Sequence, residues 1–253
     1  VNQTLAYAEA LQAYREYHPM ELLDWADTGD DRVDGRPQLY RHRVLNGSAS
    51  ITLLDSRSFR DVQLPPIQDP TDLQQIIAFI IGTFTPDRTL LGQPQLEQLK
   101  ADLLADQAAG VTWKIVVMPE PIQNFGVVNA EDRFEGYAAE RTGLLAFIEA
   151  AAIDNVVFVA GDFHGTIVND LAYQTIGDNG LESTPIRAFE VVTGPMAFFT
   201  GRFGPAVAQI AFAAGLITEE EFNFYLSLDR PGQDAFVEEL VNAQIVPLGY
   251  SPI

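Results

Sequence analysis

Four short runs of consecutive apolar residues constrain the fold of this chain more than any other feature. They occupy residues 50–54, 113–118, 155–160 and 188–192. Each is rich in valine or isoleucine and apolar on successive positions, which is typical of strands covered on both faces of a sheet. Helical patterns occupy residues 4–17, 93–109 and 138–152. Strands that alternate with helices predict an α/β domain built in layers.

The C-terminal part of the chain has a different pattern, because helix follows helix there. Three helices are expected, over residues 204–214, 218–228 and 233–243. The second opens with a capping box made by Thr218 and Glu221. Pro231 and Gly232 are expected to separate the last two helices. Because about 50 residues make a marginal core alone, we expect residues 201–253 to be a helical appendage packed on the domain formed by the first 200.

The composition excludes several classes of function. The 253 residues include 35 acidic and 15 basic side chains, for a formal charge of −20, and no cysteine. Disulfide scaffolds, cysteine-ligated zinc, thiol catalysis and iron–sulfur centres are therefore excluded. Only two basic residues are lysines, Lys100 and Lys114, so no polybasic patch predicts binding to duplex nucleic acid or anionic lipid.

The location of the protein is constrained only weakly by the sequence. The longest apolar runs, residues 76–81 and 206–214, are shorter than the ~20 residues that a membrane span needs. The absence of cysteine together with the acidity favours an exported protein, extracellular or periplasmic, with a salt-tolerant protein as the alternative. The chain begins with Val1 and lacks a signal-peptide pattern, so we expect a removed N-terminus or a longer precursor.

Asp162 and His164 are the sharpest candidates for a functional site. Ligands of open α/β sheets lie outside the carboxyl ends of the strands, and this pair directly follows the third apolar run, between Gly161 and Gly165. A carboxylate and an imidazole suit a hard or borderline metal ion, and flanking glycines let the backbone approach a ligand closely. The spacing therefore makes both candidate metal ligands. The alternative is that Asp162 caps the turn and His164 is a structural histidine.

Arg57 and Arg60 follow the first apolar run, where guanidinium forks are suited to hold a phosphate. The alternative is a surface ion pair with Asp55, Asp61 or an aspartate upstream. Glu140 and Arg141 open a helical pattern, where solvated charges are common.

Other chemistries lack their sequence support. The chain contains no G-x-S-x-G, no G-x-G-x-x-G, no P-loop lysine motif and no H-E-x-x-H, so the serine hydrolase, dinucleotide, NTPase and zincin interpretations have no motif behind them. His18 precedes a proline and His42 lies in an arginine-rich strand candidate, so both are expected to be structural.

A series of segments, in order and spacing, resembles the C-terminal half of the PhoD-like alkaline phosphatases and phosphodiesterases. The segments are YREYHP at 14–19, LYR at 39–41, LLDSRSFR at 53–60, RTLLGQPQL at 88–96, WK at 113–114, FEGYAAER at 134–141 and VFVAGDFH at 157–164. The likeness covers roughly residues 10–194, and several motifs in series are more specific than any one of them.

The resemblance implies a calcineurin-like metallophosphoesterase fold, a sheet sandwich flanked by helices, of which this chain holds the C-terminal half. It also implies iron and calcium as metals and phosphate mono- and diesters as substrates. The G-D-x-H motif of the family falls on Asp162 and His164. By the resemblance, we expect both to contact metal or phosphate, as metal ligands and catalytic residues.

Two further family motifs add candidate substrate contacts. The L-D-x-R-x-[YF]-R motif falls on Asp55, Arg57 and Arg60, and the alternative is that this motif has a structural role. The D-x-W-D-G-Y-x-x-x-R motif runs from Asp132 to Arg141, with phenylalanine and glutamate in place of the tryptophan and second aspartate. By the resemblance, the expected substrate-binding residues are Arg57, Arg60, Tyr137 and Arg141.

The family also places metal ligands in an N-terminal half, including a G-D strand end and a W-D-D-H-E motif, and neither occurs here. We therefore expect a preceding segment or an accompanying chain to supply the missing ligands. Two alternatives stay open: a degenerate, non-catalytic phosphatase fold used for interaction or surface assembly, and a calcium-binding domain with oxygen ligands and no catalysis.

Overall fold

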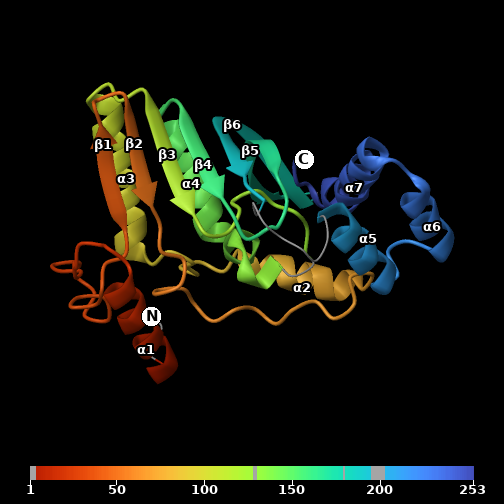
Figure 1. The fold of residues 1–253 in the computed structure, drawn as a ribbon, viewed down its shortest axis with the longest axis horizontal. Coiled ribbons are helices and arrows are strands. Elements are labelled where there is room, and N and C mark those ends of the chain that lie inside the picture. Colours follow the sequence, from red (N-terminus) through yellow and green to blue (C-terminus); the bar gives the residue numbers. More distant parts are fainter. Residues whose placement is uncertain (1–3, 128–129, 179, 195–202) are drawn as a thin grey trace.

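A computed structural model of the chain describes residues 4–127, 130–178, 180–194 and 203–253 (Figure 1). In this part of the chain, six strands form one mixed sheet in the order β1-β2-β3-β4-β6-β5. The strands are β1 (Arg41–Leu45), β2 (Ala49–Leu53), β3 (Trp113–Met118), β4 (Val156–Ala160), β5 (Ile167–Gly177) and β6 (Gly180–Val192). The expected α/β class is confirmed, and the sheet contains both parallel and antiparallel strands.

The four predicted strands form the parallel centre of the sheet. β2, β3, β4 and β6 pair in parallel, with Ile51 opposite Ile115, Ile115 opposite Val157, and Val157 opposite Phe189. β1 and β5 are antiparallel to their neighbours and form the two edges. β5 and β6 form a hairpin that the sequence pattern predicts only in part. β6 begins at Gly180 and not at the predicted residue 188, and β5 was not predicted.

Two helices close one face of the sheet. They are α3 (Gln93–Ala108) and α4 (Ala138–Ala150), which lie behind the strands in Figure 1. Leu99 and Leu103 of α3 and Leu144 of α4 are buried in one cluster with Val116 and Phe158 of the strands. We call this side of the sheet the closed face.

The opposite side, which we call the open face, carries two rows of apolar side chains in register. One row is Ile51, Ile115, Val157 and Phe189; the other is Leu53, Val117, Val159 and Val191. None of the eight belongs to a buried core cluster of the described residues. Leu53 is 43% exposed, Val157 is buried, and the other six are partly buried. Figure 1 shows no helix in front of these strands within the described part. Parallel strands ordinarily have both faces covered.

The remaining elements lie outside the two layers. They are α1 (Leu5–Tyr17), α2 (Leu73–Thr83), the 3₁₀ helices Ala130–Asp132, Phe134–Tyr137 and Val246–Leu248, and the C-terminal helices α5 (Phe203–Ala213), α6 (Glu219–Ser227) and α7 (Arg230–Ile245). The C-terminal helices have a small core of their own, in which Ala208, Tyr225 and Val237 are buried. The predicted boundary between residues 200 and 201 lies outside the described residues and stays a prediction.

Local signals at these helices were partly correct. The capping box of Thr218 and Glu221 is formed at the start of α6. The expectation that Pro231 and Gly232 separate the last two helices is wrong, because α7 begins at Arg230 with Asp229 as its N-cap. Proline in the first helical turn removes no hydrogen bond, since the first amides of a helix have no partner within it.

Among the described residues, no helix combines the length and apolar character required to cross a membrane.

Candidate functional site

The parallel register brings the ends of the four central strands to one edge of the sheet, as expected. Backbone hydrogen bonds extend the pairing past the strands, from Leu54 N to Val117 O, from Gly161 N to Pro119 O and from Thr193 N to Ala160 O. The segments after each strand are therefore neighbours in space. We call this edge the carboxyl edge.

Asp162 and His164 lie at the carboxyl edge on an unusual turn. Both side chains are exposed, and both residues have a left-handed backbone, with φ of 64° and 59°. Phe163 between them stacks on Phe125 with ring centroids 4.0 Å apart and an angle of 18° between the rings. A left-handed conformation costs a residue other than glycine roughly 1–2 kcal/mol, and such outliers cluster at functional sites.

Arg57 connects this turn to two other carboxylates. Its guanidinium lies 2.8 Å from Glu120 and 2.9 Å from Asp132, while 46% of the side chain stays exposed. Partial burial lowers the pKa of Arg57, but the hydrogen bond to Asp132 and the charges of Glu120 and Asp162 outweigh it and raise the pKa. Arg57 is thus ion-paired, but with carboxylates from other segments of the carboxyl edge and not with the aspartates nearest in sequence.

Glu120 is a site residue that the sequence interpretation did not commit to, although it lies directly after β3. It is fully buried, and its two carboxylate oxygens have no hydrogen-bond partner of good geometry within the described residues. The Ser56 hydroxyl beside it is also buried. Burial raises the pKa of Glu120, against the effects of the Ser56 hydroxyl and of the Arg57 charge. A carboxylate between two prolines, at a strand end, was the signal that marked it.

Asp132 forms ion pairs with Arg57 and Arg60, the two arginines that the sequence predicts as phosphate-binding residues. Its Oδ1 accepts hydrogen bonds from Arg57 at 2.9 Å and Gln63 at 2.6 Å, and lies 2.8 Å from Arg60. Burial works to raise the pKa of Asp132, but the hydrogen bonds from Arg57 and Arg60 lower it overall. Arg60 is mostly buried and also lies 5.7 Å from the centre of the Tyr137 ring.

Tyr137 and Arg141, expected as substrate contacts, are buried inside the domain. The Tyr137 hydroxyl donates to Asp61 O at 2.9 Å. The Arg141 guanidinium donates to Ile122 O, to Ala172 O at 2.9 Å and to Gln174 Oε1 at 2.9 Å. Arg141 therefore lies in the packing between α4, β5 and the segment after β3, whereas Tyr137 lies against the segment after β2. The substrate-binding role expected for both stays a prediction.

Of the three residues of the motif at 55–60, Asp55 has a structural role. Its carboxylate accepts hydrogen bonds from the backbone amides of Arg57 and Ser58 and from the Ser58 hydroxyl. Gln95 of α3 bonds both the amide and the carbonyl of Asp55. These contacts fix the turn that carries Arg57.

Three buried glutamates fix the other segments at this edge through backbone amides. Glu190 accepts from Ile122 N at 2.7 Å and Gln123 N at 3.0 Å. Glu135 holds the amides of residues 125 and 126, and Glu140 those of residues 90 and 91. Glu140 is therefore not a solvated charge of the first helical turn. Burial raises the pKa of all three, that of Glu190 to about 7.

The metal prediction for Asp162 and His164 is untested by this geometry. Within residues 4–127, 130–178, 180–194 and 203–253, no group of three or more His, Cys, Asp or Glu side chains is arranged to hold a metal ion. The His164 side chain or backbone has contacts of its own. His18 bonds Tyr14 O at 2.9 Å, and His42 bonds Thr52 at 3.0 Å and lies 3.4 Å from Asp106.

The fold and this edge define a class: an α/β protein whose carboxyl edge gathers carboxylates, arginines and an imidazole, as sites for metal ions or anionic ligands do. The sequence model of the PhoD-like phosphatases matches residues 2–232, and the chain belongs to that family. Its sequence is 30% identical over 178 residues to alkaline phosphatase D of Bacillus subtilis (strain 168), covering 66% of this chain and 27% of that protein.

A solved structure, described as the structure of PhoD, has a similar fold. It superimposes with a TM-score of 0.54 and 24% sequence identity over 77% of this chain and 35% of that one. The chain thus spans about a third or less of the length of the relatives that it matches.

Proposed function

We propose that this chain is the part of a PhoD-like metallophosphoesterase that carries the Asp162–His164 turn, and that the intact protein hydrolyses phosphate mono- and diesters. The observation that carries the proposal is the turn itself, in which two polar residues at the carboxyl edge hold left-handed backbones around an anchored phenylalanine. Family membership supports the reaction class.

The donor chemistry of the turn fits the metals that the family implies. A carboxylate oxygen and an imidazole nitrogen suit iron, and the carboxylate also suits calcium. Asp162 and His164 would hold the metal, which when bound stabilises charge on the reacting phosphate group. Because the described residues include no group of three ligands, the remaining ligands come in this proposal from polypeptide outside this chain.

Arg57 is the residue that we assign to the substrate phosphate. Its guanidinium is half exposed, and Glu120 and Asp132 hold it in one orientation. A preorganised guanidinium matches two phosphate oxygens at once. Arg60 is more buried and acts by positioning Asp132. In this proposal Tyr137 and Arg141 stabilise the fold and do not contact the substrate, because their polar atoms form hydrogen bonds inside the fold.

The open face supports the expectation of a sheet sandwich completed by polypeptide outside this chain. Two rows of Val, Ile, Leu and Phe side chains form a surface of the kind that packs against a second sheet at about 10 Å. A second sheet on this face would end beside the carboxyl edge. The missing ligands would then come from the polypeptide that carries that sheet.

The second candidate is a non-catalytic phosphatase fold that serves interaction or surface assembly. It is favoured by one observation, the absence of a three-ligand group among the described residues. The extracellular or periplasmic location is likewise a proposal and rests on the lack of cysteine and the charge of −20.

The test is a phosphatase assay of the full-length protein with p-nitrophenyl phosphate and bis-p-nitrophenyl phosphate, beside metal analysis. We expect Asp162→Asn and His164→Ala to lower kcat/KM by about a hundredfold or more, the size of effect of losing one charge-stabilising contact, and to lower the bound metal. Asp87→Asn is the matched control, since Asp87 is exposed and also has a left-handed backbone. Unchanged activity in both site variants would overturn the site, and a metal-loaded protein without turnover would favour the second candidate.

A further inference from the structure

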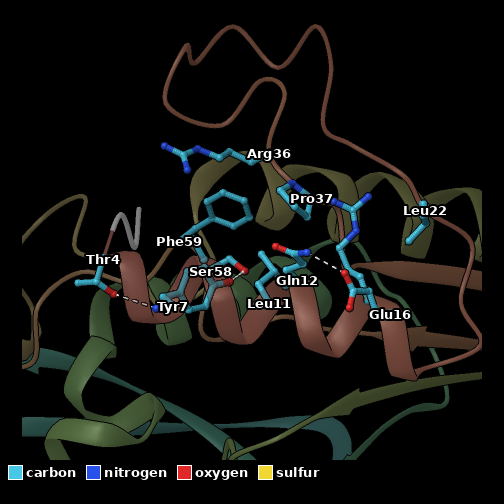
Figure 2. A pocket seen from close by; sticks show the side chains of 12 residues that line it. Thr4, Tyr7, Leu11, Gln12, Glu16, Leu22, Arg36, Pro37, Ser58 and Phe59 are labelled. Atoms are coloured by element: carbon cyan, nitrogen blue, oxygen red, sulfur yellow. Dashed lines mark hydrogen bonds between the residues drawn. The ribbon is translucent and has the colours of Figure 1, made fainter.

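A cavity of about 520 Å³ lies between α1 and the segments that follow it (Figure 2). We call it the α1 pocket. Its lining includes Tyr7 and Leu11 of α1, Leu22, Arg36 and Pro37 of the next segment, and Phe59 from the turn after β2. Its volume is within the range of about 300–1,000 Å³ that is typical of sites for small molecules.

Most of the wall is apolar. Leu11, Leu22, Pro37 and Phe59 supply carbon surface from three separate segments, and in Figure 2 Leu11 and Gln12 rise from α1 toward Phe59 and Pro37. No residue of α1 is buried, although its sequence is rich in alanine, leucine and tyrosine. An apolar ligand group in the pocket would be shielded from water, and so would the inner side of the helix.

One end of the pocket is polar and fixed. Tyr7 and Ser58 share a hydrogen bond, and Ser58 donates its own proton to Asp55, so Tyr7 is the donor to Ser58. Burial raises the pKa of Tyr7, which keeps its hydroxyl protonated. This chain of hydrogen bonds ties α1 to the turn that carries Arg57 and gives the cavity a rigid end.

The charge of the lining is opposite to that of the chain. Its charged residues are Arg15, Arg36 and Glu16, whereas the chain as a whole has a charge of −20. Arg15 lies 3.5 Å from Asp24. Arg36 is different: its guanidinium has no ion pair or hydrogen bond within the described residues, and in Figure 2 its side chain extends above the Phe59 ring.

We infer that the α1 pocket binds a small amphiphilic anion, whose alkyl or aryl group fills the apolar cavity and whose phosphate, sulfate or carboxylate head pairs with Arg36. A guanidinium without an ion-pair partner among the described residues, next to an apolar cavity, is the complement of such a molecule. An anionic head group would pair with Arg36, which has no ion pair among the described residues although the chain has 35 acidic residues. The inference does not depend on metal binding or on phosphatase activity.

The experiment is calorimetric titration of the purified chain with decyl phosphate, as monomer below its micelle concentration, and with decanol as the neutral analogue. We expect saturable binding of decyl phosphate and binding at least about tenfold weaker for decanol, since a tenfold change equals about 1.4 kcal/mol, the size of one charged hydrogen bond. Arg36→Ala should weaken decyl phosphate binding by a similar factor. Leu11→Trp, which fills the cavity, should abolish it.

The matched control is Arg43→Ala, which removes the same charge from an exposed position in register with the open face. We expect it to leave binding unchanged. Binding that falls with Arg43→Ala but not with Arg36→Ala would place the amphiphile on the open face and overturn the inference. So would equal affinity for decanol, or unaltered binding to a Leu11→Trp protein whose circular dichroism matches that of the parent chain.

Discussion

The two faces of the central sheet differ in how their side chains are covered, although side chains of the two faces alternate along the same four strands. On the closed face, Val116 and Phe158 are buried among leucines of α3 and α4. That face also buries polar groups with partners, such as Glu190 and Lys114. On the open face, side chains such as Val117 and Val159 are apolar and outside every buried cluster of the described residues.

The difference shows which part of the fold is determined within this chain. The closed face has its covering layer in α3 and α4, so its apolar packing is formed within this chain. The open face has the apolar composition of a core, but no helix of the described part covers it, whereas parallel strands ordinarily have both faces covered. The carboxyl edge, where Asp162 and His164 lie, is the border between these two regions, and its site is as incomplete as the open face in our proposal.

Two phenylalanines on neighbouring strands test this comparison most strongly. Phe158 points into the closed face and is fully buried, whereas Phe189 lies on the open face. Phe158→Ala should lower the free energy of unfolding by about 3–5 kcal/mol, because it removes buried surface and leaves a cavity. Phe189→Ala should lower it by about 1 kcal/mol or less, since its ring is only half buried. Urea unfolding of both variants measures the difference.

Equal losses of stability in this chain would break the comparison, because they would mean that the open face is already covered. In a longer protein that contains the proposed second sheet, Phe189→Ala should approach the effect of Phe158→Ala. The same pair of variants therefore tests the chain and the intact protein.

The pH dependence of stability tests the polar part of the closed face. Burial raises the pKa of Glu190 to about 7, against hydrogen bonds from Ile122 and Gln123 and the charge of Arg141, while Glu135 adds to the increase. The folded state therefore holds this proton more tightly than the unfolded state. Its contribution, about 3 kcal/mol, is fully present below pH 4.5 and is lost as the pH rises through 7.

Urea midpoints between pH 5 and 8 measure this loss. Glu190→Gln, which cannot ionise, should flatten the slope, whereas Glu182→Gln, on the exposed part of the same strand, should leave it unchanged. Part of the slope will remain, because burial also raises the pKa values of Glu120, Glu135 and Glu140. An equal slope for Glu190→Gln and the parent chain would mean that Glu190 is ionised without loss of stability.

Strands with apolar side chains on both faces were predictable from sequence, because their pattern does not depend on what covers them. β3 was predicted with its correct bounds, and the ends of the parallel strands meet as expected. The hairpin of β5 and β6 was missed in part because residues 182–185, Glu-Ser-Thr-Pro, are exposed and include Pro185, which local propensity places outside strands.

Residues of the candidate site were predictable from the sequence where the signal lay in neighbouring residues, and not where the partners of a side chain lie far away in the chain. Asp162 and His164 were identified from the strand end and the flanking glycines. The burial of Arg141 was not predictable, because its partners Ala172 and Gln174 belong to a strand that the local pattern did not reveal. The burial of Glu140 was not predictable either, since the amides that it bonds lie about 50 residues earlier in the chain.

The smallest expected effect distinguishes the two interpretations of Asp162 at the border of the faces. If the side chain serves a ligand, the left-handed backbone at φ 64° is strain that the fold tolerates for function. Asp162→Gly should then stabilise the chain by up to about 1 kcal/mol, because glycine adopts this conformation without a steric penalty. Ala152→Gly, at φ 50° after α4, is the control in which a similar gain is expected. If instead Asp162 caps its turn, Asp162→Gly should lower the urea midpoint while Ala152→Gly raises it, and the metal assignment would lose its main support.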